Sequence, residues 1–171
     1  MRKVLIIDTS LLCVWLQVPG METVGSDDDK WDFQRVDEKI QLEIEQSTVL
    51  VLPLAVVVEI SNHIAQAKNN YDVAQKLAEI MTKATDETSP WAAFSEQIIL
   101  WEADKLKNLA AQFPGWATQK TSMGDGSMVI LGQHYQEKGF CVEFLTADKG
   151  LKAQEPSPLP QPTIRSNQKR K

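Results

Sequence analysis

Three short runs of apolar, mostly β-branched residues limit what this chain can fold into. They are KVLII at 3–7, TVLVL at 48–52 and FCVEFL at 140–145, and stretches with helical periodicity separate them. Runs this apolar are typical of strands that are buried on both faces, as in parallel sheets. Parallel strands need crossover connections, which are usually helices. The sequence therefore predicts an α/β fold with a mainly parallel sheet.

Helices are expected where apolar residues recur three or four positions apart. This spacing predicts helices at 37–44, 54–67, 71–82, 97–112 and 127–138. The last of them is expected to stop at Gly139. Asp27-Asp28-Asp29 is expected to be an exposed loop that leads into the first helix.

Length and composition exclude several classes of protein. A chain of 171 residues with 43% apolar residues has the size of one domain with a real core. No apolar run approaches the roughly 18 residues of a membrane span, and Asp8 interrupts the N-terminal run, unlike a secretory signal. Cys13 and Cys141 cannot form a disulfide scaffold, so we expect buried reduced thiols in a cytoplasmic protein without a membrane partner.

Charge is unevenly distributed along the chain. The formal net charge of −5 excludes a generally basic nucleic-acid binder. Residues 152–171 carry five basic residues and one acid, a net of +4, so residues 1–151 carry −9. Residues 154–171 include four prolines and end in Lys169-Arg170-Lys171. We expect them to form an extended basic strap beside a folded domain at 1–153.

Four carboxylates stand where the predicted strands and helices begin or end. Asp8 and Asp148 follow two apolar runs. Glu59 lies within the apolar stretch 52–64, and Asp125 lies between two glycines. Ligands of open parallel sheets bind beyond the carboxyl ends of the strands. Like charges held together repel, and a divalent cation relieves the repulsion. We therefore predict that these four acids hold one or two Mg²⁺ or Mn²⁺ ions.

Each of these residues also has a plainer interpretation. Asp125 could be only a helix cap, Asp148 a turn residue, and Glu59 part of a solvated helix face. His63 shares the helix face of Glu59, but a histidine there is more typical of a polar rim than of a ligand, and His134 is expected to be structural. The five tryptophans could stack on bases, but at least three are expected in the core or an interface; they are Trp15, Trp31, Trp91, Trp101 and Trp116.

Four segments, which span about residues 1–153, resemble the motifs of PIN-domain nucleases. They are IIDTSLL at 6–12, LPLAVVVEISNHI at 52–64, GDGSMVILGQHY at 124–135 and FLTADKGLKA at 144–153. The resemblance implies a three-layer α/β/α sandwich with a metal-dependent ribonuclease site. It makes the four acids the catalytic metal ligands, with Ser10 and Thr146 orienting water or phosphate from behind them.

The chain departs from this family pattern at three places. Gly126 follows Asp125 where an alanine is usual, and Lys149-Gly150 follows Asp148 where a second acid often comes. The segment 70–121 is longer than a compact toxin needs, so we expect a helical elaboration there.

The function implied by the resemblance is in-line hydrolysis of RNA phosphodiesters, with activated water as the nucleophile. Lys149, Lys152 and the basic strap are candidates for RNA contacts. The toxins of bacterial toxin–antitoxin pairs belong to this family, so an antitoxin, another protein or a second copy of the chain are the partners to consider. The alternative is a catalytically weak PIN-like module that binds RNA or a protein. A phosphatase or receiver-like domain that uses Asp8 fits poorly, because Ser10 stands where phosphatases have a second aspartate.

Overall fold

A small parallel sheet forms the centre of the molecule. The structure is a computed structural model that describes residues 2–157. Its strands β1 (Lys3–Ile7), β4 (Val49–Val51) and β5 (Cys141–Leu145) run parallel in the order β4-β1-β5. In this register Leu5 of β1 lies between Leu50 and Glu143. The predicted α/β class with a parallel sheet is thus confirmed.

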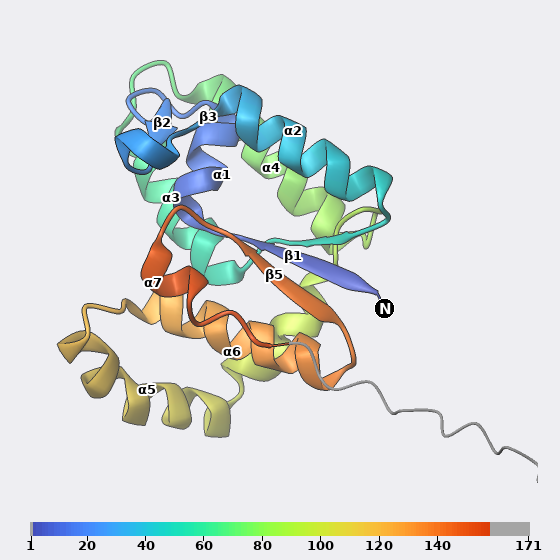
Figure 1. Cartoon of the computed structure of the whole chain (residues 1–171), viewed down its shortest axis with the longest axis vertical. Helices are drawn as coiled ribbons and strands as arrows, with labels where there is room; N and C mark the ends of the chain where they lie inside the picture. Colours follow the sequence, from blue (N-terminus) through green and yellow to red (C-terminus); the bar gives the residue numbers. More distant parts are fainter. Residues whose placement is uncertain (1, 158–171) are drawn as a thin grey trace, which may run out of the picture.

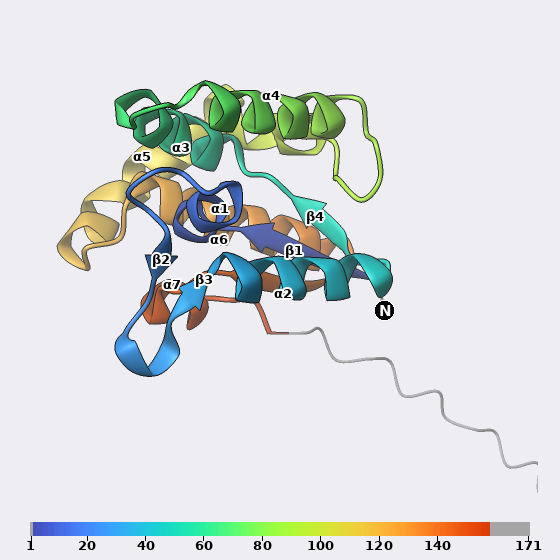
Figure 2. The same cartoon turned by 90° about the horizontal axis from the view of Figure 1, so that it is seen from above.

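Seven α-helices surround the sheet in the described part of the chain. They are α1 (Thr9–Leu16), α2 (Phe33–Glu45), α3 (Leu54–Gln66), α4 (Tyr71–Thr85), α5 (Ala103–Thr118), α6 (Met123–Glu137) and α7 (Lys149–Lys152). Figure 1 shows α1 and α2 on one side of β1 and β5, with α5 and α6 on the other. Helix α3 contacts both α1 and α6, and α4 packs on α3 at the outside (Figure 2). Among residues 2–157, no helix has the length and apolar character needed to cross a membrane.

Asp8 alone separates the first strand from the first helix, and both elements are largely buried. Residues 4–7 of the central strand are fully buried, as expected for a parallel strand covered on both faces. Asp8 then caps α1, and six of the eight residues of α1 are buried as well. The abrupt change from strand to helix places Asp8 at the carboxyl end of β1.

A short hairpin projects beside the end of the sheet (Figure 2). Its strands β2 (Thr23–Val24) and β3 (Trp31–Asp32) are antiparallel, and the 3-10 turn η1 (Asp27–Asp29) lies between them. The predicted loop of three aspartates is therefore a turn within a hairpin. Gly25 has a φ of +99°, and a Cβ there would lie 2.2 Å from the carbonyl oxygen of Asp29. Only glycine fits this position.

Three helix predictions are corrected, and in the first of them the helix expected at 37–44 begins earlier, at Phe33. The single helix expected at 97–112 is in fact a 3-10 helix, η2 (Phe94–Trp101), followed by α5, with an extended residue at Glu102 between them. The buried Gln97 amide donates to Leu52 O at 2.7 Å and accepts from Leu54 N at 3.0 Å, so η2 is tied to the segment between β4 and α3. The helix expected to begin at Ser127 begins at Met123.

Both edges of the sheet are occupied. Beside β4, Leu50 N donates to Pro90 O and Ala92 N donates to Leu50 O, each at 2.8 Å. Beside β5, Phe144 N donates to the Glu155 carboxylate at 2.8 Å, and the Lys152 ammonium donates to Phe144 O at 3.0 Å. The described start of the predicted strap, residues 154–157, thus lies against β5; the rest of the strap lies outside the described residues.

Candidate functional site

All four predicted acids line one hollow at the carboxyl end of the sheet, which we call the acidic hollow. Its volume is about 480 Å³. Asp8 follows β1, Glu59 lies on α3, Asp125 lies in the first turn of α6, and Asp148 caps α7. The remaining lining residues are Thr9, Ser10, Met21, Val24, Gly25, His63, Ser122 and Ala147. Residues far apart in the sequence therefore lie around one hollow, and the catalytic role of each acid stays a prediction.

Asp8 is held in a fixed orientation by three donors. One carboxylate oxygen accepts from Thr9 N at 2.7 Å. The other accepts from Ser10 Oγ at 2.7 Å and Thr146 Oγ1 at 2.9 Å. Burial raises the pKa of Asp8, these hydrogen bonds lower it, and the charge of Asp125 raises it; the net direction is upward. The surroundings thus disfavour the charged form of Asp8, which is the condition that a bound cation would relieve.

Thr9 connects Asp8 to Glu59. Its hydroxyl donates to Glu59 Oε2 at 2.8 Å, while its backbone N donates to Asp8. The side chain of Thr9 is buried, whereas Glu59 is exposed at the rim. Sequence reasoning assigned no role to Thr9, although its place between Asp8 and Ser10 was the available signal.

Asp125 both caps a helix and lines the acidic hollow. Ser122 and Asp125 form a reciprocal capping box, in which Ser122 Oγ accepts from Asp125 N at 3.0 Å and Asp125 Oδ2 accepts from Ser122 N at 3.1 Å. Ser122 Oγ also donates to Asp125 Oδ2 at 2.7 Å. The plainer interpretation of Asp125 as a cap is therefore correct, and it does not exclude a second role. The same holds for Asp148, whose Oδ1 accepts from Gly150 N at 2.6 Å and Leu151 N at 3.1 Å.

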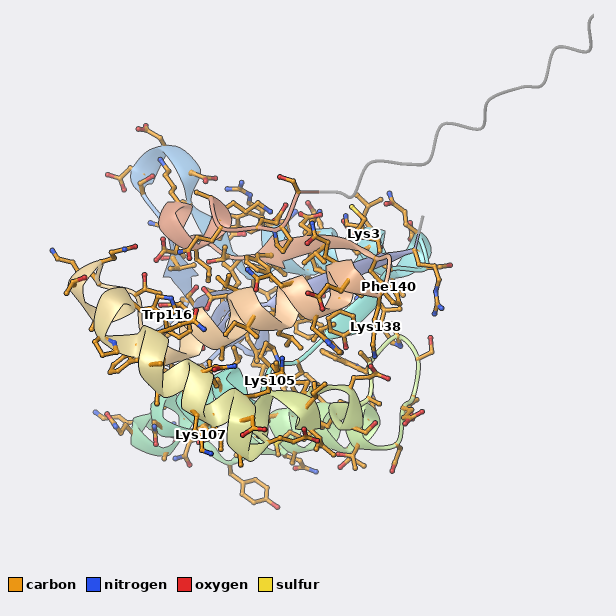
Figure 3. All side chains as sticks on the ribbon, turned by 90° about the horizontal axis from the view of Figure 1, so that it is seen from below. Lys3, Lys105, Lys107, Trp116, Lys138 and Phe140 are labelled. Atoms are coloured by element: carbon orange, nitrogen blue, oxygen red, sulfur yellow. The ribbon has the colours of Figure 1, made fainter. Side chains whose placement is uncertain are left out.

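The departure at Gly126 has a physical reason. A Cβ at this position would lie 2.3 Å from the ring of Trp116, which is too close for any real contact. Trp116 comes from α5 and lies where α5 and α6 meet (Figure 3). The indole packs against the first turn of α6, next to Asp125, and glycine is required for that contact.

The donor chemistry of the acidic hollow suits a hard divalent cation, which prefers carboxylate oxygens. Within residues 2–157, however, no three His, Cys, Asp or Glu side chains are grouped so that they could share one ion. One oxygen of each of Glu59, Asp125 and Asp148 is held by a protein donor. The other oxygen of each accepts no hydrogen bond from this part of the chain, and these are the oxygens that an ion would recruit. The Mg²⁺ or Mn²⁺ site stays a prediction.

Two of the predicted contact residues lie beside the acidic hollow. Lys149 and Lys152 line an adjoining hollow of about 330 Å³. Lys152 is already engaged, since its ammonium lies 2.7 Å from a Glu155 carboxylate oxygen and also donates to β5. His63 lies at the rim of the acidic hollow, as expected from its helix face, while His134 lies elsewhere, near Glu96.

The cysteines and tryptophans occupy largely structural positions. Cys13 is fully buried, and burial together with the charges of Glu59 and Asp8 raises the pKa of its thiol to about 12. Cys141 is half-buried, so the prediction of two buried thiols is correct for Cys13 and too strong for Cys141. Trp91 is buried, and the other tryptophans are partly buried.

Sequence reasoning also missed the lining residues in and just before the hairpin, namely Val24, Gly25 and Met21. Their part depends on how the hairpin packs on α1, for which local periodicity gives no signal. In comparisons with known proteins, no family model, no curated protein and no solved structure matches this chain.

Proposed function

We propose that this chain is a metal-dependent endoribonuclease with a PIN-like, three-layer α/β/α arrangement. One observation carries the proposal: acids from four separate elements line a single hollow at the carboxyl end of a parallel sheet. Converging carboxylates raise the electrostatic energy of the folded chain unless they serve a ligand. In parallel α/β sheets this edge is where ligands bind.

The chain's own residues would prepare the site for hydrolysis. When bound, Mg²⁺ or Mn²⁺ lowers the pKa of a water and stabilises the charge on the leaving oxygen. Ser10 and Thr146 hold the carboxylate of Asp8 in one orientation, and Thr9 holds that of Glu59. Glu59 and Asp148 are exposed, so the site is open to a polymer and not only to a small molecule.

Point variants with matched charge test the enzyme proposal. Asp8→Asn and Asp148→Asn should each abolish cleavage of a mixed RNA panel in Mg²⁺ or Mn²⁺, because each removes a ligand charge and keeps the size of the side chain. The control is Asp104→Asn, whose side chain is 95% exposed on α5; it should cleave like the parent. RNA binding should largely survive in all three variants.

Two results would refute the enzyme proposal. One is no cleavage by the parent with either ion across neutral to mildly alkaline pH. The other is unchanged cleavage by Asp8→Asn. If the protein is the toxin of a toxin–antitoxin pair, expression of the parent in cells should arrest growth and expression of Asp8→Asn should not.

A second candidate function is a catalytically weak PIN-like module that binds RNA or a protein partner. Two observations favour it. The carboxylates of Asp125 and Asp148 already accept hydrogen bonds at the starts of helices. Within residues 2–157, no three His, Cys, Asp or Glu side chains are grouped so that they could hold one metal ion. Under this candidate the parent binds members of the RNA panel, or a protein, without cleaving RNA. Asp8→Asn then binds as tightly as the parent.

A further inference from the structure

The hollow of about 330 Å³ that adjoins the acidic hollow is lined in part by lysines, and we call it the lysine hollow. The two share Ala147 and Asp148. Three lysines line it, Lys39, Lys149 and Lys152, together with two aromatic residues, the partly buried Trp31 and the buried Phe144. The β2–β3 hairpin contributes to both, with Val24 and Gly25 lining the acidic hollow and Trp31 the lysine hollow.

Ion pairs neutralise two of the three acids that line the lysine hollow. Arg35 lies 2.7 Å from Asp29, and Lys39 lies 2.9 Å from Glu143. The third acid is Asp148, which belongs to the acidic hollow as well. Lys149 forms no ion pair within residues 2–157. In a chain whose first 151 residues carry −9, this leaves a local cation next to the proposed cleavage site.

Trp31 is held at this position by contacts from the hairpin and from α2. It pairs with Val24 across the hairpin. The guanidinium of Arg35 lies 3.9 Å from the centroid of the indole ring. Arg35 is anchored in turn by the carbonyl of Lys30 at 2.8 Å and by Asp29. A fixed aromatic ring beside a cation is the combination that binds single-stranded nucleic acid, because the ring stacks on a base and the cation attracts a phosphate.

We propose that the lysine hollow binds the nucleotide that neighbours the scissile phosphate of a single-stranded RNA. Its base stacks on Trp31, and its phosphate pairs with Lys149. The proposal rests on the ribonuclease function proposed above, because the shared Ala147–Asp148 turn is what places this nucleotide next to the catalytic acids. Duplex RNA does not fit the same role, since its bases are already stacked and paired.

Binding of a short fluorescein-labelled poly(U) strand, measured by anisotropy in the non-cleaving Asp8→Asn background, tests the ring. Trp31→Leu should weaken binding by about 5- to 150-fold, the range expected for loss of one stacked base. Trp31→Phe keeps a ring and should lose less. A duplex of the same length should bind Asp8→Asn with and without the Trp31→Leu change alike.

Salt dependence tests the cation. Lys149→Gln should reduce the slope of log affinity against log salt by about 0.7, the value for one phosphate contact on a single strand. Lys107→Gln removes the same charge from α5, which lies on the other side of the sheet (Figures 1 and 3), and should leave the slope unchanged.

The outcomes separate this inference from the ribonuclease proposal. If the parent cleaves RNA while Trp31→Leu and Lys149→Gln bind and cleave as it does, the inference is wrong and the ribonuclease proposal stands. If the parent neither binds nor cleaves any RNA, both are wrong. If Trp31→Leu does not fold, Trp31→Phe and Lys149→Gln decide, since parent-like binding by both contradicts the inference.

Discussion

Glu43 offers a quantitative test of how the sheet that carries the site is held together. It lies on α2 with its side chain 3% exposed. One carboxylate oxygen accepts from Lys3 of β1 and from Lys39, and the other accepts from Thr48, all at 2.6 Å. Burial alone would raise the pKa of Glu43. The three hydrogen bonds outweigh burial and lower its pKa from 4.5 to about 2.

The sign and size of the effect follow from linkage. A drop in pKa from 4.5 to about 2 on folding corresponds to about 3 kcal/mol of stability. Because the folded pKa is the lower one, this contribution is complete above pH 4.5 and is lost as the pH falls toward 2. Glu43→Gln keeps the size of the side chain and removes the charge. It should lower the free energy of unfolding at neutral pH by about 3 kcal/mol.

Urea unfolding followed by tryptophan fluorescence, from neutral pH down to about pH 3, measures this difference. The gap between parent and Glu43→Gln should shrink as the pH falls below 4.5, because Glu43 takes up a proton at a higher pH in the unfolded parent than in the folded parent. Glu45→Gln, an exposed position on the same helix, is the control and should unfold like the parent. A gap that stays constant with pH would refute the reasoning, because it would assign the loss to packing.

Three further predictions concern the site and its surroundings. Without metal, Asp8→Asn should be more stable than the parent, and the parent's stability should fall as the pH rises through the raised pKa of Asp8; in thermal melts Mg²⁺ should raise the Tm of the parent more than that of the variant. Gly126→Ala should lower the free energy of unfolding by about 1–3 kcal/mol through its clash with Trp116, whereas Gly115→Ala, with open space around its Cβ position, should not destabilise the fold. Removal of residues 166–171, outside the described part of the chain, should leave urea unfolding unchanged and reduce the salt dependence of RNA binding, and an unchanged salt slope would assign this segment another task.

The apolar runs made the sheet predictable, because parallel strands buried on both faces leave a continuous signature in the sequence. Helix α1 lacked a comparable signal. Most of its residues are buried, so it has no polar face from which a helical period could be recognised. The break at Glu102 was also invisible locally, since it depends on Gln97 reaching the backbone at Leu52 and Leu54.

The candidate site could be predicted only where a local sequence signal marks its residues. Asp8 directly follows β1 and Asp148 lies between the end of β5 and the start of α7, and strand ends can be recognised from the sequence. The hydrogen bond from Thr9 to Glu59 joins residues fifty positions apart, and the hairpin that lines both hollows is placed only by tertiary packing. The sequence also did not reveal that Asp125 serves at once as a cap and as part of the hollow.

The protected edges of the sheet have a consequence for self-association. An open edge strand offers free backbone groups to which a strand of another molecule can add, and this is a common route to aggregation and to strand-exchanged dimers. Here the segment around Trp91 occupies the β4 edge, and the side chains of Glu155 and Lys152 take both backbone groups of Phe144 at the β5 edge. Strand addition is disfavoured at both edges. Docking of a protein partner or a second copy of this chain on the helices or the hairpin is therefore favoured over strand addition to this sheet.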